Sequence, residues 1–277
     1  MPQLTVCFCK LARTVQATLF QSDFMTDIQK IINPDEKTVE RYGRAWRFSK
    51  PKILDGYMYG ELGYIAMGTE IKPFYDEEKQ EFLQQTSNAS LTNYVLWVLD
   101  LKYQTLAFEI KPPDIKYQSF KGAFECFLYK HLELGLRIED FLEKSKFRAW
   151  ADEVGRITSF RATLRLPNPN WSIVPKSIQD LIKDTNADKG KIELTKDKDS
   201  NDSLNTAETV IEDAVTYAEY GYSDILARGE KGKKPAMFDS RRYSPTDQVD
   251  IVKGITENEK QKAIKNMLDK FITRKYK

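Results

Sequence analysis

Residues 156–171 read RITSFRATLRLPNPNW, a segment in which apolar and polar residues alternate. Successive side chains of an extended chain point to opposite faces, so this pattern predicts a strand that buries one face. The buried face would hold Phe160, Ala162, Leu164 and Leu166. The opposite face would hold Ser159, Arg161, Thr163 and Arg165. The segment therefore predicts a sheet with one packed face and one basic face.

The rest of the chain mixes strands and helices without a regular alternation. Strands are predicted at 4–11, within 46–67, in a hairpin over 94–111, at 191–195 inside a polar connector (181–205), and at 248–255. Helical spacing of apolar residues predicts helices at 21–33, 119–135, 138–154 and 206–221, and a last helix near the C-terminal end. This pattern indicates an α+β fold with mixed, mostly antiparallel sheets and packed helices. We expect two subdomains, an N-terminal region (1–155) and a C-terminal region (156–277).

Charge is distributed unevenly along the chain, although the formal net charge of the 277 residues is only +2. Residues 171–225 hold 12 acidic residues against 6 lysines, whereas residues 226–277 hold 14 basic residues against 7 acidic ones. Such asymmetry indicates a polyanionic partner more directly than the net charge does. No segment has the length and apolar character of a membrane span, and the N-terminal residues lack the pattern of a secretory signal. We therefore expect a cytoplasmic protein that does not bind membranes.

Three basic clusters carry the functional prediction. The first, within RYGRAWRFSKPK, interleaves aromatic residues with Arg41, Arg44, Arg47 and Lys50. The second is the strand quoted above, which supplies Arg156 and, as candidate contacts, Arg161 and Arg165. The third, within ARGEKGKK and SRRY, holds Arg228, Lys231, Lys233, Lys234, Arg241 and Arg242. Guanidinium groups pair with phosphates and aromatic rings stack on bases, so these twelve residues are candidate nucleic-acid contacts, provided that the clusters share one surface.

An enzymatic alternative is a metal-dependent nuclease that uses Asp100, Glu109 and Lys111. In nucleases of the PD-(D/E)xK type an Asp and a Glu hold Mg²⁺ while a Lys on the same strand face assists the attacking water. Glu109 and Lys111 share a face of the predicted hairpin, but Asp100 lies beside its turn. The spacing therefore disfavours this alternative.

Other catalytic and cofactor signals are weak. The single histidine, His131, lies at the edge of a predicted apolar helical stripe, and no nucleophile elbow or phosphate-binding glycine loop accompanies it. Cys7, Cys9 and Cys126 do not make a disulfide framework or a four-ligand metal site. We assign no catalytic residue, metal or cofactor from the sequence.

The order of the predicted elements, with SDILARGEKG at 223–232 and SRRYSP after it, resembles RexA-like phage-exclusion proteins and the Kiwa defence protein KwaB. The resemblance implies a bacterial or phage protein that binds DNA without reading its sequence, self-associates as a homo-oligomer, and acts in antiviral defence with a protein partner. It assigns no functional residue to this chain.

The leading expectation is a non-enzymatic protein that grips the phosphate backbone of nucleic acid, with double-stranded DNA as the expected partner. A third reading is a protein-interaction module in which residues 228–242 dock an acidic protein. Both readings need the basic residues to be accessible, which depends on how the elements pack.

Overall fold

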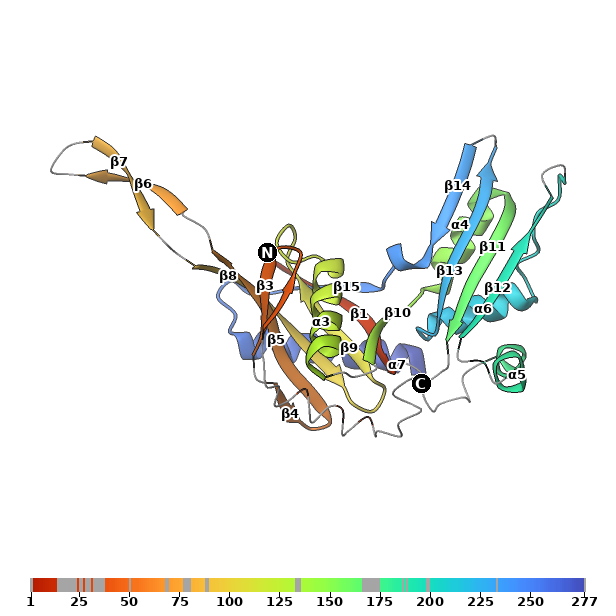
Figure 1. Cartoon of the computed structure of the whole chain (residues 1–277), viewed down its shortest axis with the longest axis horizontal. Coiled ribbons are helices and arrows are strands. Elements are labelled where there is room, and N and C mark those ends of the chain that lie inside the picture. Colours follow the sequence, from red (N-terminus) through yellow and green to blue (C-terminus); the bar gives the residue numbers. More distant parts are fainter. Residues whose placement is uncertain are drawn as a thin grey trace.

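The computed structural model describes the chain except residues 1, 14–23, 25–26, 28–30, 32–37, 50, 68–69, 77–80, 88–89, 133–135, 166–174, 186, 188, 198–199, 233 and 277. Side chains are described over the same residues, apart from those of 13, 65–92, 130–132 and 183. The fold is α+β with antiparallel sheets, as the sequence predicts. Figure 1 shows two lobes, each built on its own sheet.

The larger lobe contains a nine-stranded sheet in the order β10-β1-β9-β8-β5-β3-β2, with β15 also beside β1 and β4 beside β5. Its strands are β1 (Gln3–Arg13), β2 (Thr38–Arg41), β3 (Arg44–Phe48), β4 (Lys52–Leu54), β5 (Tyr57–Met67), β8 (Ser90–Asp100), β9 (Thr105–Ile110), β10 (Leu136–Asp140) and β15 (Thr246–Asp250). A two-stranded ribbon, β6 (Glu70–Asp76) and β7 (Glu81–Ser87), extends from β5 and β8 away from this lobe (Figure 1).

Helices cover both faces of the larger sheet. On one face α3 (Tyr117–Leu132) stacks Phe120 on Phe108 of β9, with ring centroids 3.8 Å apart. On the other face α7 (Glu257–Tyr276) stacks Phe271 on Phe8 of β1 at 4.4 Å. Helix α3 contacts both β2 and β10, which lie at opposite edges, so the sheet curves around it. Burial on both faces explains why the central strands β8 and β9 are apolar almost throughout.

The smaller lobe contains a four-stranded sheet in the order β12-β11-β13-β14. Its strands are β11 (Arg156–Arg165), β12 (Lys189–Thr195), β13 (Ser223–Lys231) and β14 (Lys234–Asp239). Its helices are α4 (Lys144–Val154), α5 (Lys176–Asp184), α6 (Val210–Glu219) and the short 3-10 helix η2 (Ser240–Arg242) after β14. Phe160, Ala162 and Leu164 of β11 are fully buried beneath α4, α5 and α6, as the alternation predicts. Leu166 lies outside the described residues.

The division between the lobes differs from the expected boundary at residue 155. The chain leaves the larger sheet after β10, builds the smaller lobe from α4 to η2, and returns as β15 and α7. Residues 246–277 were assigned to a C-terminal subdomain, but β15 pairs with β1 and α7 packs on the larger sheet. The smaller lobe is thus an insertion between two strands of the larger one.

The predicted hairpin over 94–111 is confirmed as β8 and β9, and the strand predicted at 191–195 is the edge strand β12. The helix predicted over 138–154 was wrong in its first part, because residues 136–140 form β10 against β1 and α4 begins only at Lys144. Most of the helix predicted over 21–33 lies outside the described residues. Phe24 and Ile31 belong to the described part, and both are buried.

Candidate nucleic-acid interface

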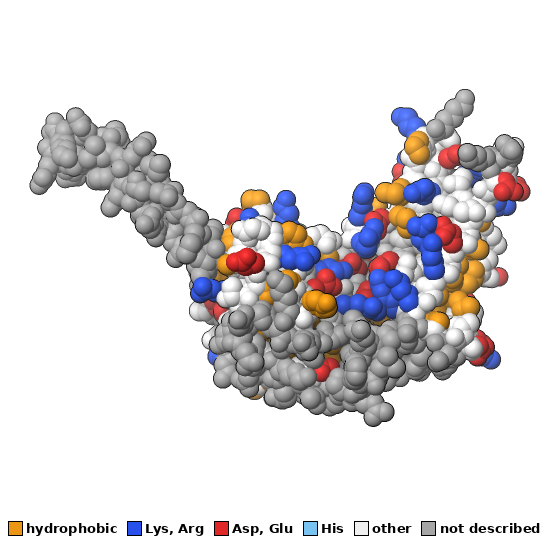
Figure 2. All heavy atoms as spheres, in the orientation of Figure 1, with side chains coloured by type: hydrophobic (Ala, Val, Ile, Leu, Met, Phe, Trp, Pro, Cys, Tyr) orange, Lys and Arg blue, Asp and Glu red, His pale blue; other side chains and the backbone are white. Residues whose placement is uncertain are grey.

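The open face of the smaller sheet is strongly basic. Helices cover one side of this sheet, and paired residues of antiparallel strands share a face, so the register identifies the side chains on the other side. We call this open side, together with η2, the basic face; its charged residues are Arg156, Arg161, Arg165, Lys189, Lys191, Glu193, Asp224, Arg228, Glu230, Asp239, Arg241 and Arg242. Eight of these twelve are basic. Figure 2 shows Lys and Arg side chains gathered on this lobe and in the hollow where it meets the larger lobe.

Two arginines of the basic face are exposed and have no ion pair with a described residue. Arg228 lies on β13 beside Met237 of β14, and Arg242 ends η2 at the base of the lobe. A guanidinium group without an internal partner keeps its donors for an external anion. Arg228 and Arg242 are therefore the strongest candidate phosphate contacts.

Arg161 lies on the open side, as its strand predicts, but shares a carboxylate with a neighbouring lysine. Its Nη2 is 2.5 Å from Oε1 of Glu193, whose Oε2 is 2.6 Å from Nζ of Lys191. Hydrogen bonds from Lys191 and Arg161 lower the pKa of Glu193 to about 2. All three side chains are at least 42% exposed, and solvent-exposed ion pairs contribute little, so a phosphate can replace Glu193 as the partner of Arg161.

Arg241 forms a fork on Asp239, with Nε 2.9 Å from Oδ1 and Nη2 2.7 Å from Oδ2. These hydrogen bonds lower the pKa of Asp239 and fix the guanidinium at the start of η2. Asp239 is nearly buried while the Arg241 side chain is 59% exposed. The pair therefore holds one guanidinium edge in place and leaves the remaining nitrogen accessible.

Arg165 does not have the role that the sequence predicts. Although it lies on the same side of β11 as Arg161, its Nη1 is 2.7 Å from Oε2 of Glu139 on β10, and its Nη2 pairs with Asp224 of β13. Its side chain is only 16% exposed, and Glu139 also pairs with Arg137. Arg165 thus joins the two lobes through a buried network and is not available to phosphate.

The third cluster divides between the two faces of the sheet. Lys231 and Lys234 lie opposite each other in the register at the end of the β13–β14 hairpin and therefore on the same face. Lys231 forms an ion pair with Glu153 of α4, so this face is the helix-covered side. Lys233 lies outside the described residues. Only Arg228, Arg241 and Arg242 of this cluster contribute to the basic face.

The first cluster lies on the larger lobe and does not join the basic face. Arg41 and Arg44 lie on the α3 side of the sheet; Arg44 donates to the carbonyl of Asp114 and lies 4.1 Å from the Tyr64 ring centroid. Arg47 lies on the opposite face, beside a depression that also includes Tyr94 and Glu61. Lys50 is outside the described residues. The condition that the three clusters share one surface is therefore not met: the first cluster lies on the larger sheet.

Sequence reasoning missed Lys189 and Lys191 on the basic face. Lys189 begins β12, whose alternation with the half-buried Ile192 and Leu194 points the lysines outward. The edge strand predicted at 191–195 contained this signal, but it was read as part of a polar connector. Arg156 pairs with Glu230 of β13 at 2.8 Å across the start of β11, which a single sequence does not reveal.

The three residues of the nuclease alternative do not assemble. Glu109 lies opposite Leu96 of β8, whereas Asp100 lies four residues further along that strand, opposite Thr105. Four strand residues correspond to about 13 Å, too far for two carboxylates to share one Mg²⁺. Glu109 is nearly buried and pairs with Lys111 at 3.2 Å, while Asp100 accepts a hydrogen bond from the Tyr103 amide.

Within the described residues, no group of three or more His, Cys, Asp and Glu side chains is placed to hold a metal ion. Cys7 and Cys9 are buried on the α3 side of β1, where burial raises the pKa of both thiols, and Cys126 is free on α3. The side chain of His131 lies outside the described part of α3.

Among the described helices, none combines the length and apolarity that a membrane crossing requires.

The sequence matches no protein-family model and no curated protein.

Proposed function

We propose that this protein binds DNA through the phosphate backbone, using the basic face of the smaller lobe. The observation that carries the proposal is the uncovered face of the β12-β11-β13-β14 sheet, on which exposed Arg228 and Arg242 have no described ion pair. Around them the side chains of Arg161 and Arg241 are exposed, although each pairs with a carboxylate. A cluster of this kind supports phosphate contact without base readout.

The side chains of the basic face support backbone binding over sequence recognition. Specific readout in the major groove requires an element that enters the groove, most often a helix. Here the helices α4, α5 and α6 lie on the opposite side of the sheet, and the open side presents arginine and lysine side chains from strands. We therefore expect binding that is strongly salt-dependent and weakly selective for sequence.

The hollow between the lobes, seen in Figure 2, gives a duplex a place to lie against the basic face. The ion pair of Arg165 with Glu139 joins the two lobes and restricts the movement of the smaller sheet, which carries Arg228, relative to the larger one. A surface restrained in this way loses less entropy on binding than a mobile one. On the basis of the resemblance to phage-exclusion and Kiwa proteins, we extend the proposal to a role in anti-phage defence.

The direct test is fluorescence anisotropy with a labelled, mixed-sequence duplex of about 25 base pairs, titrated across a salt series without divalent metal. Four contacting cations predict a slope of log K against log salt near −3 to −4, that is, about four neutralised phosphates. Arg228→Glu and Arg242→Glu should each weaken binding at least about tenfold and reduce the slope by about one.

The matched control is Lys262→Glu, which makes the same charge change at an exposed residue of α7, away from the basic face. It should leave affinity within about twofold, since long-range effects of one surface charge are screened. Equal losses for Arg228→Glu and Lys262→Glu would show that binding follows net charge alone and would overturn the proposed site. Absence of duplex binding at low salt, together with capture of a stoichiometric acidic protein through Arg228, would favour the protein-interaction alternative.

A further inference from the structure

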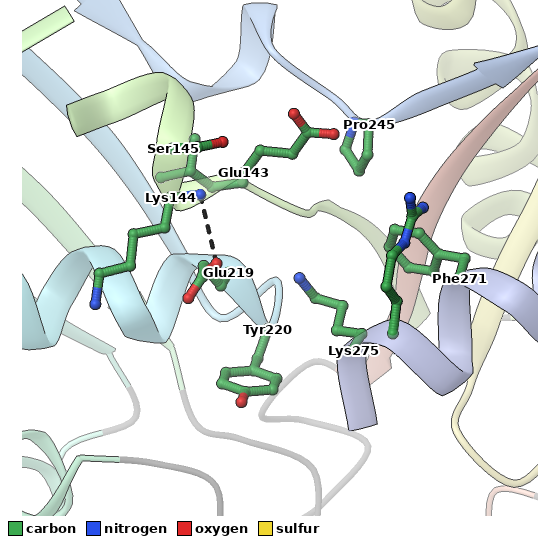
Figure 3. A pocket seen from close by; sticks show the side chains of 10 residues that line it. Glu143, Lys144, Ser145, Glu219, Tyr220, Pro245, Phe271 and Lys275 are labelled. Atoms are coloured by element: carbon green, nitrogen blue, oxygen red, sulfur yellow. Dashed lines mark hydrogen bonds between the residues drawn. The ribbon is translucent and has the colours of Figure 1, made fainter. Parts of the chain in front are cut away.

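A cavity of about 460 Å³ lies where the two lobes meet, away from the residues assigned to DNA. Helices α4 and α6 of the smaller lobe line it with Glu143, Lys144, Ser145, Glu219 and Tyr220. Helix α7 of the larger lobe lines it with Phe271, Arg274 and Lys275 (Figure 3). Its volume falls in the range of small-molecule sites, and a ligand in it would touch both lobes.

Lys275 is the most informative group in this cavity. Its side chain points from α7 towards Glu219 and Glu143 in Figure 3, but its Nζ has no hydrogen bond or ion pair with a described residue. Instead three aromatic rings surround it, with Nζ 5.0 Å from the centroid of Phe141 and 5.6 Å from those of Tyr220 and Phe271. Such rings favour a cation, but they leave all three N–H donors unused.

Burial lowers the pKa of Lys275 to about 8, while Glu219 and Glu143 oppose the shift. The ammonium is therefore still the main form at pH 7, and it is poorly hydrated. An anion that enters the cavity would gain a desolvated charge partner, which makes the contact stronger than at an exposed lysine.

The neighbouring groups define what else the ligand must carry. Arg274 is exposed, lies against the ring of Phe271 and has no ion pair with a described residue, so it provides a second cation. Glu219 accepts only a long bond of 3.4 Å from the Lys144 amide, and no partner is described for the Glu143 carboxylate. The two carboxylates need donors such as hydroxyl or amino groups.

We propose that this interlobe cavity binds a small phosphate monoester that also carries hydroxyl or amino donors, with the phosphate on Lys275 and Arg274 and the donors on Glu143 and Glu219. A phosphate dianion matches two cations, and a ligand without donors would face the two carboxylates unfavourably. This inference does not depend on the proposed DNA binding.

Isothermal titration calorimetry with adenosine 5′-monophosphate tests the proposal, with adenosine as the ligand control. Wild-type protein should bind the monophosphate and not adenosine. Lys275→Met should weaken binding at least about tenfold, because a charge-assisted contact is lost while a linear apolar side chain remains among the aromatic rings. Lys270→Met, an exposed position on the same helix, should bind as wild type does.

The remaining outcomes of this titration would count against the proposed site. Lack of binding to both the monophosphate and inorganic phosphate, or unchanged binding by Lys275→Met, overturns the proposal. Binding that disappears with Arg228→Glu would place the ligand on the basic face and overturn it as well. If circular dichroism shows that Lys275→Met does not fold, Arg274→Met replaces it, since an exposed side chain can be truncated without loss of packing, and it should weaken binding severalfold.

Discussion

Arg165 of β11 and Glu139 of β10 form an ion pair of 2.7 Å that connects the two lobes. Both side chains are largely removed from solvent, and Asp224 completes the pairing of the guanidinium. Removing one partner of a buried ion pair leaves the other charge uncompensated, which is far more costly than the loss of a surface pair.

The first prediction compares two arginines of one strand. Arg165→Met should lower the free energy of unfolding by about 3 kcal/mol, because Glu139 and Asp224 lose their partner. Arg161→Met, four residues away, should cost less than about 1 kcal/mol, since its pair with Glu193 is exposed. Urea unfolding at pH 8 measures both. Similar values for the two variants would contradict the assignment of Arg165 as the connection between the lobes.

The second prediction concerns pH. Burial raises the pKa of Glu139 from 4.5 to about 7, although Arg165 and Arg137 oppose the shift. The folded state therefore binds a proton more tightly than the unfolded state, and Glu139 makes stability fall as pH rises from about 4.5 through about 7. Glu139→Gln should remove this slope. Unfolding curves at pH 5 and pH 8 should show a smaller difference for the variant, and an unchanged difference would refute the role of Glu139.

The third prediction concerns the buried Lys10, which changes stability with pH in the opposite direction to Glu139. Lys10 of β1 donates to the carbonyl of Tyr103 at 2.7 Å and lies 5.6 Å from the rings of Tyr222 and Tyr276. Burial lowers its pKa from 10.5 to about 8, with Asp100 opposing the shift. The unfolded state then binds more protons between these values, so Lys10 makes stability rise with pH over this interval.

Lys10→Met should therefore flatten the stability profile between pH 8 and pH 10, as measured by urea unfolding. Lys102→Met is the control and should keep the wild-type slope, because Lys102 is exposed, although it lies beside Tyr103 as Lys10 does. A profile that Lys10→Met leaves unchanged would mean that other groups cause the dependence.

The fourth prediction uses two glycines of the smaller sheet. A Cβ at Gly229 of β13 would lie 2.3 Å from Val154 Cγ1 and 2.4 Å from the carbonyl oxygen of Arg156, so Gly229→Ala must displace α4 or β11. A Cβ at Gly190 of β12 would lie 3.5 Å from Leu164, an ordinary contact. Gly229→Ala should cost about 2–3 kcal/mol, whereas Gly190→Ala should stay within about 1 kcal/mol of wild type. Thermal unfolding compares them, and a tolerated Gly229→Ala would count against the close packing of α4 on β13.

The local parts of the fold were predictable because their signals lie in short windows of sequence. Strand β11 alternates with a period of two, and Phe160 and Ala162 are buried as that period requires. Residues 138–140 were predicted as the start of a helix, and Ile138, Phe141 and Leu142 do have the i, i+3, i+4 spacing of one helical face. Pairing with β1, far away in sequence, decides the conformation of residues 136–140.

The candidate site was predictable only in part, for the same reason. The alternation placed Arg161 on an open face, but it placed Arg165 there too, because nothing local reveals Glu139 as its partner. Likewise, Arg228 and Lys231 lie three positions apart on β13 and therefore on opposite faces, but local sequence does not show which face α4 covers. Which basic residues are free for a ligand depends on contacts between distant segments.

The way the chain enters and leaves the smaller lobe has a consequence for its origin. Asp140 pairs with Cys9 and Thr246 pairs with Cys7, so the two connections leave neighbouring positions on the same edge of β1, about 7 Å apart. A module joined at two adjacent points can be gained or lost in one genetic event without breaking the host sheet. All the strand pairings of the larger sheet would therefore be kept if a short link replaced residues 141–245.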